Sequence, residues 1–369
     1  MTDKLGYYRV GDLKFHSKLE AIEMHAKTGI HPHWDFNEAV FGSYDWRTEP
    51  QETILELYRQ RAQQLRDKYD YIVLIYSGGA DSETALQSFI DNDIKLDEVA
   101  SYVNYSATGD RNNTLNGEIF DNAIPRIKGI QGLPHRIIDL KDLQLEYFTN
   151  ATDWIYGTNT FFNSNVVARE GLALKIPQWR QLIEQGKRVC LLWGLDKPRV
   201  LHINNKFVVR FIDIVDNGPT VKSMTGELPY SDEIFFWTPD LPKIVIKQGH
   251  LIKNHLNNYT FKSPWISEQK SDLAYKVIEG KYHWLSNHGL HSIIYPNYRI
   301  GTLSAPKPGS TVFSPRDVWF NNMTQRSELD VWKRGVDHLW RTIPDYWKNN
   351  PADVGSGLKA CWSRDYYLE

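Results

Sequence analysis

The sequence has little cysteine and no long apolar run. Its two cysteines, Cys190 and Cys361, are too few for a disulfide framework or for a four-cysteine zinc or iron–sulfur site. No stretch reaches the ~18 apolar residues that a membrane-spanning helix needs, and the opening MTDKLGYYRVGDLKF contains no apolar signal core. We therefore expect a cytoplasmic protein without a membrane partner.

Neither sign of charge is in excess. The 43 Lys and Arg residues nearly balance the 45 Asp and Glu residues, which gives a formal net charge of -2. Such a chain has no overall cationic field, so binding to nucleic acid would need a local basic patch. The length of 369 residues and the hydrophobic fraction of 41% are typical of a globular chain of about two domains.

Two common phosphate-binding motifs are also absent. The sequence contains neither GxxxxGK[ST] nor GxGxxG, the signatures of P-loop NTPases and of dinucleotide-binding enzymes. These two enzyme classes therefore lose support.

Apolar strand patterns alternate with helical patterns in the middle of the chain. Strands are predicted for YIVLIY at 71–76, EVASYV at 98–103, HRIIDL at 135–140 and RVCLLW at 188–193. Segments in which apolar residues recur at helical spacing lie between these strands. This alternation predicts an α/β fold, with a parallel twisted sheet flanked by helices.

The N-terminal segment 1–47 predicts a small separate unit. YYRV and LKFH flank a Gly11-Asp12 turn, and Ser17 with Glu20 forms a capping-box pattern before a helical stretch. We expect a hairpin, a helix and then an aromatic loop that ends at residue 47.

The sheet region is predicted to span 48–205. RVLHI and KFVVRFIDI flank Asn204-Asn205, a pair typical of hairpin turns, and we expect the parallel sheet to end there. The remainder, 206–369, is predicted to be a mainly helical, aromatic-rich substrate or interaction region.

The six residues SGGADS at 77–82 form the pattern SGGxDS between a predicted strand and a predicted helix. Gly78 and Gly79 permit a tight turn and close approach of the backbone to an anion, which the helix N-terminus attracts. Ser77 and Ser82 add hydroxyl donors.

Asp81, within the same pattern, has the carboxylate that Mg²⁺ prefers. The pattern therefore predicts a cradle for pyrophosphate and its Mg²⁺. The simpler alternative is a glycine-rich turn in which Asp81 or Ser82 caps the helix.

The segment YIVLIYSGGADS resembles the PP-loop family, the N-type ATP pyrophosphatases, which include asparagine, argininosuccinate and NAD synthetases and tRNA-modifying enzymes. The resemblance implies an adenine nucleotide alpha-hydrolase-like, Rossmann-like fold. It also implies that ATP is cleaved between its α and β phosphates to adenylate a substrate. By this resemblance Ser77, Gly78, Gly79, Asp81 and Ser82 bind pyrophosphate and Mg²⁺.

The resemblance extends to two further segments. The end of the second strand, at Val103 and Asn104, would contact adenosine. The segment VCLLWGLDKPR is similar to a strand and loop of asparagine-synthetase-like domains. Gly194 would permit the turn, Asp196 would bind Mg²⁺, and Lys197 or Arg199 would stabilise charge on the phosphates; a solvated turn closed by proline is the alternative.

The sequence also departs from the family pattern. Glutaminase-containing synthetases carry a nucleophilic cysteine directly after the initiator Met, whereas this chain has Thr2. Cys190 lies inside a predicted buried strand, which disfavours persulfide chemistry. We therefore expect an ATP-dependent, AMP-forming ligase or synthetase, without a glutaminase domain, that adenylates a carboxylate, amide or carbonyl oxygen before a nitrogen nucleophile attacks.

Two alternatives remain open. Seven lysines interleaved with aromatic residues in 243–281 would suit an enzyme that modifies a nucleobase, tRNA or DNA, although Lys243 and Lys247 could instead reach ATP phosphates. A non-catalytic adenine-nucleotide-binding module would use its aromatic C-terminal region to bind a protein partner. That region also leaves a homo-oligomer open.

Histidines form two groups in the sequence. His31 and His33 stand near the N-terminus, and His283, His288 and His291 follow in the C-terminal region. Neither group matches a zinc motif, so we expect packing and hydrogen bonding in both.

Overall fold

The computed structural model of the chain describes residues 3–103, 118–140, 142–143, 146–147, 154–157, 170–195, 199–203, 206–213, 220–258, 293–297, 330–348 and 358–369. Its helices and strands are, in chain order, β1 (Tyr7–Val10), β2 (Leu13–Phe15), α1 (Lys18–Thr28), β3 (His33–Asp35), α2 (Glu38–Phe41), α3 (Ile54–Lys68), β4 (Tyr71–Ile75), α4 (Ala80–Ile90), β5 (Glu98–Val103), the π-helix η1 (Glu118–Ala123), α6 (Ile124–Lys128), β6 (His135–Asp139), the 3-10 helix η2 (Trp154–Tyr156), α9 (Leu172–Lys175), α10 (Pro177–Glu184), β7 (Val189–Trp193), β8 (Arg199–Ile203), β9 (Lys206–Arg210), α11 (Val221–Thr225), β10 (Ser231–Ile234), α12 (Lys243–Asn258), α18 (Asp330–Thr342), the 3-10 helix η4 (Asp345–Trp347) and β11 (Tyr366–Tyr367).

A parallel sheet forms the centre of the described chain. Its strand order is β10-β7-β4-β5-β6, and every neighbouring pair is parallel. The predicted α/β class and the four predicted strands are confirmed. Counted along the chain the order is 3-2-1-4-5, so the direction of winding reverses between β4 and β7, as in doubly wound folds.

Helices cover both faces of this sheet because alternate side chains of each strand point to opposite sides. Ile72 and Leu74 of β4 belong to an apolar cluster that includes Leu57 of α3 and Leu86 of α4. Val73 belongs to a second cluster, which α9 and α10 cover. The alternation continues in the other strands, which explains their uninterrupted apolar sequences.

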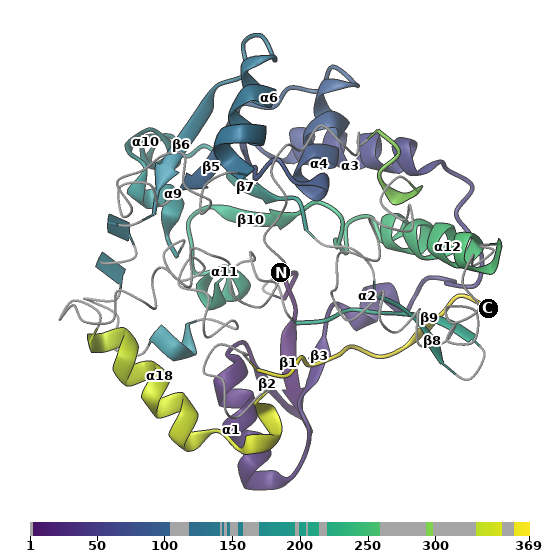
Figure 1. Ribbon diagram of the computed structural model, residues 1–369, viewed down its shortest axis with the longest axis vertical. Helices are drawn as coiled ribbons and strands as arrows, with labels where there is room; N and C mark the ends of the chain where they lie inside the picture. Colours follow the sequence, from purple (N-terminus) through teal and green to yellow (C-terminus); the bar gives the residue numbers. More distant parts are fainter. Residues whose placement is uncertain are drawn as a thin grey trace.

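The N-terminal unit is also a sheet. β1 and β2 form the predicted hairpin, and β3 pairs antiparallel with the other edge of β1. The expected aromatic loop therefore contains β3 and the short helix α2. Figure 1 shows this sheet and α1 at the end of the molecule opposite α4 and α6.

The capping box predicted at Ser17 does not form. Ser17 takes the N-cap position of α1, but within the described residues its buried hydroxyl has no hydrogen-bond partner. Lys18, the next residue, is buried in an ion pair with Asp213, so a tertiary contact orients the first turn. A complete capping box does stabilise α3, between Thr53 and Glu56.

The predicted hairpin at 204–205 is confirmed, because β8 and β9 pair antiparallel with Ile203 opposite Lys206. However, the parallel sheet does not end there. β10 follows the hairpin and pairs with β7, so a strand from 206–369 forms the sheet edge. The described part of that region contains β9, β10 and β11 besides its helices.

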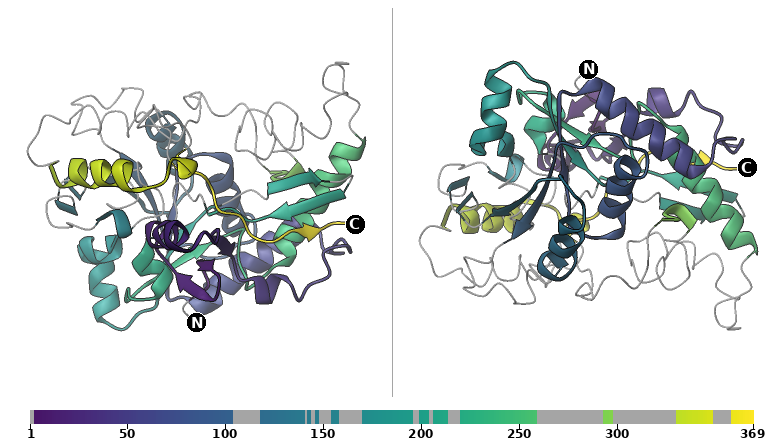
Figure 2. Two further views of the ribbon diagram at one scale, coloured as in Figure 1. Left: turned by 90° about the horizontal axis from the view of Figure 1, so that it is seen from below. Right: turned by 90° about the horizontal axis from the view of Figure 1, so that it is seen from above.

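The C-terminal tail joins the hairpin to the N-terminal sheet. β11 pairs antiparallel with β9, and the amide of Trp34 in β3 donates to the carbonyl of Trp362. Figure 2 shows α12 and α18 at opposite sides of the molecule. Among the described helices, none is both long and apolar enough to cross a membrane.

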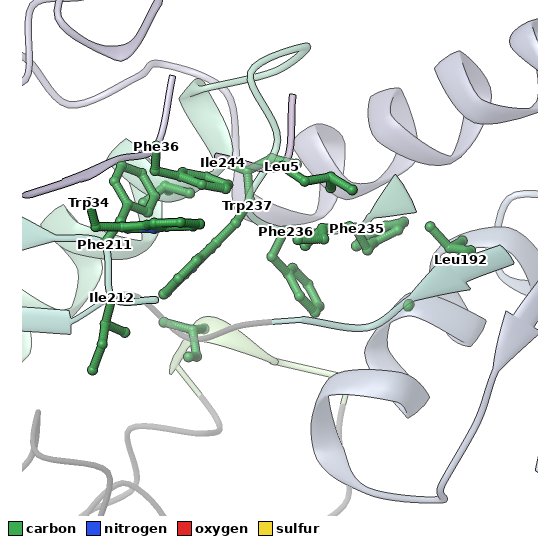
Figure 3. Close-up of a cluster of buried hydrophobic side chains, with 14 of the residues drawn as sticks. Leu5, Trp34, Phe36, Leu192, Phe211, Ile212, Phe235, Phe236, Trp237 and Ile244 are labelled. Atoms are coloured by element: carbon green, nitrogen blue, oxygen red, sulfur yellow. The ribbon is translucent and has the colours of Figure 1, made fainter. Parts of the chain in front are cut away.

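Three aromatic residues after β10 connect these parts. Figure 3 shows Phe235 and Phe236 near Leu192 of the parallel sheet, and Trp237 near Phe36 and Phe211. The ring of Trp237 lies 5.2 Å from that of Phe211 and 5.9 Å from that of Phe36. One short segment thus packs against the parallel sheet, the N-terminal unit and the hairpin.

The carboxylate of Glu233 in β10 is buried among cations. It accepts from Lys4 Nζ at 2.6 Å, Arg61 Nη2 at 2.9 Å and Lys68 Nζ at 2.8 Å, and also from Tyr69. Burial alone raises the pKa of Glu233, but the charges of Arg61 and Lys4 outweigh it and hold the pKa well below its ordinary value of 4.5.

We predict that Glu233→Gln lowers the free energy of unfolding by about 3 kcal/mol, because the cations around it then keep only the partly exposed carboxylate of Asp240 as a partner in this cluster. The stabilisation is present above pH 4.5 and is lost as the pH falls toward the lower folded-state pKa. Denaturant unfolding from pH 7 to pH 3 should show a smaller loss of stability in the variant than in the wild type.

The matched control is Asp70→Asn, which breaks an exposed ion pair with Arg188 and should leave the unfolding midpoint at pH 7 nearly unchanged. If Glu233→Gln and Asp70→Asn behave alike, the buried cluster does not stabilise the fold.

Candidate functional site

The SGGADS loop lies at the point where the sheet changes direction. β4 ends at Ile75 and α4 begins at Ala80, so the loop follows the carboxyl end of β4, whose neighbours are β5 and β7. In open parallel sheets, ligands bind at this point because the loops of the two central strands diverge there. The topology therefore selects the same place as the sequence motif.

The loop needs its glycines. Gly78 has φ of +78°, a conformation that residues with a side chain rarely adopt. A Cβ on Gly78 would also lie 3.1 Å from the amide nitrogen of Ala123 and 3.2 Å from Cβ of Asn122. Backbone thus packs directly on η1, and the loop is held from that side.

The serines close the loop with hydrogen bonds. The amide of Ser77 donates to Ser82 Oγ at 3.3 Å, and Ser82 Oγ donates to the carbonyl of Gly79 at 3.1 Å. The amide of Gly79 donates to Ser77 Oγ at 3.3 Å. The two predicted hydroxyl groups therefore also maintain the shape of the loop.

Gly79 occupies the N-cap position of α4, and Asp81 and Ser82 lie inside its first turn. Neither Asp81 nor Ser82 therefore caps this helix, so the cap that the simpler alternative named is wrong. The amide groups of a first helical turn have no acceptor within the helix, and the helix dipole places positive charge beside them. A glycine cap supplies no side-chain acceptor to these groups, and such a helix start is typical of anion sites.

Gly194, at the end of β7, is packed against the first turn of α4. A Cβ on Gly194 would lie 2.8 Å from Cα of Ser82 and 3.0 Å from the carbonyl carbon and oxygen of Asp81. Only glycine permits this approach, which brings the end of β7 to the first turn of α4. Asp196 and Lys197 follow directly but lie outside the described residues.

The structure does not bring the other predicted site residues to the loop among its described contacts. Val103 is buried and its carbonyl accepts from the amide of Leu140 at 2.8 Å, while Asn104 lies outside the described residues. Arg199 is buried in β8. Val103 is therefore part of the hydrophobic core at the carboxyl end of β5.

Two side chains that the sequence analysis missed lie next to the motif. Glu83, in the first turn of α4, accepts from Arg126 Nε at 2.7 Å and from the hydroxyl of Tyr76, so its charge is balanced by an arginine of α6. Tyr295 donates its hydroxyl to Asp81 Oδ1. Sequence patterns give no signal for partners so distant along the chain.

A magnesium ion would fit here together with a nucleotide. Within the described residues, no three His, Cys, Asp or Glu side chains gather as a set that could hold a metal. Asp81 belongs to the loop itself, and Mg²⁺ is commonly held by one or two carboxylates and the phosphates of its substrate. A single carboxylate of this kind would suit a metal ion that arrives with a phosphate ligand.

The other candidate groups have structural partners. His33 Nε2 lies 2.7 Å from Glu38 Oε1, and the rings of His25 and His31 lie 4.2 Å apart, as expected for packing and hydrogen bonding. His283, His288 and His291 lie outside the described residues.

The described lysines of the basic stretch are paired. Lys243 pairs with Glu52 and Lys247 with Glu49, while Lys253 donates to the carbonyl of Leu368. Lys243 and Lys247 therefore contact the segment before α3, not the SGGADS loop. The other lysines of 243–281 lie outside the described residues.

Both cysteines are buried, and neither forms a disulfide. Burial raises the pKa of the Cys190 thiol well above its ordinary value, and burial has the same effect on Cys361. Because the thiolate is the reactive form, neither side chain is suited to persulfide chemistry. The prediction of Cys190 as a small buried residue is confirmed.

Comparison of the chain with protein-family models, with curated proteins and with solved structures found no match. The functional assignment consequently depends on the loop, its topology and its contacts.

We predict that Gly194→Ala lowers the free energy of unfolding by about 1–3 kcal/mol, because the new methyl group meets backbone that can move only with α4. The control is Gly129→Ala, where the added Cβ would lie at an ordinary 3.4 Å from the carbonyl of Arg126. Thermal unfolding of both variants is the measurement. Equal midpoints would show that the contact between the two loops is not tight.

Proposed function

We propose that the protein is an ATP-dependent, AMP-forming synthetase of the PP-loop type. It would adenylate a carboxylate, amide or carbonyl oxygen, with release of pyrophosphate, before a nitrogen nucleophile displaces AMP. The observation that carries the proposal is that SGGADS, at a helix N-terminus whose glycine cap has no side chain, lies at the direction change of a 3-2-1-4-5 parallel sheet.

The geometry of the loop supports pyrophosphate as the bound group. Gly78 and Gly79 bring backbone close to the start of α4, where the amide groups of the first turn can donate to phosphate oxygens. The balanced charge of Glu83 beside Arg126 leaves Asp81 as the acidic group of the motif. One carboxylate beside several amide donors suits a polyphosphate with its metal.

The proposed reaction needs no covalent enzyme intermediate. The acceptor oxygen would attack the α-phosphorus, and the bond to the β-phosphate would break with pyrophosphate as the leaving group. Bound Mg²⁺ would neutralise charge on that group. The chain itself would hold pyrophosphate through the first turn of α4, orient it through Ser77 and Ser82, and fix Asp81 for the metal.

We predict that purified protein with Mg²⁺ converts α-labelled ATP to AMP and pyrophosphate when the correct acceptor is present. Pools of amino acids, nucleosides and tRNA identify the acceptor class. Formation of ADP, or ATP binding without any product in every pool, contradicts the proposal and favours a nucleotide-binding module.

The variant Asp81→Asn should lower the rate of AMP formation by about 100-fold or more, because it removes the charge that holds the metal. Asp67→Asn, the same change on the exposed face of α3, should leave the rate unchanged. A normal rate in Asp81→Asn would mean that another group binds the metal.

A further inference from the structure

A tyrosine from the C-terminal region contacts the acidic residue of the motif. Tyr295 is fully buried, and its hydroxyl donates to Asp81 Oδ1. The two residues are separated by 214 positions in the sequence. The described segment 293–297 therefore reaches the first turn of α4 from a region without a recognisable motif.

The segment is fixed on both sides of Tyr295. The hydroxyl of Tyr58 in α3 donates to the carbonyl of Ile294 at 2.6 Å, and that hydroxyl accepts from Gln248 Nε2 of α12 at 2.8 Å. Asn297 Nδ2 donates to Asp91 Oδ2 at 3.1 Å. Segment 293–297 is thus bound to α3 and to both ends of α4.

The ring of Tyr295 is also held. Its centroid lies 5.3 Å from that of Phe236, which follows β10. A phenol fixed by its ring and by the adjacent backbone has few rotamers left, so its hydroxyl points in one direction. A hydrogen bond to a charged carboxylate is stronger than a neutral one. It therefore restricts rotation of the Asp81 side chain.

We propose that Tyr295 is a positioning residue that orients the Asp81 carboxylate for the Mg²⁺ of the bound nucleotide. The inference rests on the proposed function and adds a residue to it. Without the phenol, Asp81 keeps its charge but loses one restraint on its side chain, which weakens metal binding without removing a ligand. Segment 293–297 is then part of the nucleotide site.

The test is the Mg²⁺ dependence of nucleotide binding in Tyr295→Phe. Calorimetric titration of the full chain with a non-hydrolysable ATP analogue, at a series of Mg²⁺ concentrations, measures binding without turnover. We expect the half-saturating Mg²⁺ concentration to rise about tenfold, whereas the affinity for the analogue without Mg²⁺ stays within about twofold. AMP formation at saturating Mg²⁺ should recover most of the wild-type rate.

Two controls separate positioning from a general loss of structure. Tyr346→Phe removes the hydroxyl of an exposed tyrosine and should not change the Mg²⁺ dependence. Tyr58→Phe removes the hydrogen bond to Ile294 without touching Asp81, so it should shift the Mg²⁺ dependence in the same direction by less. If circular dichroism shows that Tyr295→Phe does not fold, the titration of Tyr58→Phe decides. A higher half-saturating Mg²⁺ concentration than in the wild type supports the positioning role, and an unchanged one contradicts it.

The outcomes distinguish the two proposals. If the wild type shows Mg²⁺-dependent binding and Tyr295→Phe needs the same or less Mg²⁺, the positioning role is wrong and the proposed function stands. Less Mg²⁺ would show that the phenol competes with the metal. If the wild type binds no nucleotide with Mg²⁺, both proposals are wrong.

Discussion

The buried carboxylate of Glu233 is the interaction on which the arrangement of the chain depends. A strand that begins Ser-Asp-Glu can enter a buried sheet edge only if its charges are neutralised there. Lys4 comes from the N-terminal unit, whereas Arg61 and Lys68 come from α3. Formation of β10 therefore requires the N-terminal unit and α3 to be in place around the sheet.

This constraint extends from β10 to the candidate site at the SGGADS loop. The chain leaves β10 through Phe235, Phe236 and Trp237. The amide of Phe235 donates to the carbonyl of Trp193, and the amide of Phe236 donates to the carbonyl of Leu195, just after β7. The same segment thus follows β7 toward Gly194, packs on the N-terminal unit through Trp237, and supports Tyr295 through Phe236. The segment 233–237 therefore connects the ionic cluster around Glu233 with Tyr295, which contacts the SGGADS loop.

The sequence predicted the strands and turns that depend mainly on neighbouring residues. Apolar runs such as 71–76 and 188–193 form strands because both faces of the sheet are covered. The pair Asn204-Asn205 predicted the hairpin that β8 and β9 form. β10 was missed because its first three residues are polar. The carboxylate of Asp232 accepts hydrogen bonds from Trp193 and Ser223. The sequence of β10 itself does not indicate these partners.

The candidate site divides in the same way. The SGGADS pattern predicted the loop and its position between strand and helix, because glycine requirements and helix ends are local properties. It did not predict Arg126 beside Glu83 or Tyr295 beside Asp81, since these pairs depend on how distant segments pack. The pattern also left the helix cap undecided until the backbone identified Gly79.

The loop is held by three segments that are far apart in the sequence. η1 packs on Gly78, the end of β7 packs on Asp81 and Ser82, and segment 293–297 holds the Asp81 side chain. A loop restrained from three directions loses little conformational entropy when an anion binds, and its donors need little reorganisation as charge develops on a leaving group. Close backbone packing restrains the amides of the loop, whereas a carboxylate is restrained by the donors that reach its oxygens, and Tyr295 is such a donor to Asp81. In the proposed metal site, Tyr295 would add to the glycines a restraint on the one carboxylate of the motif.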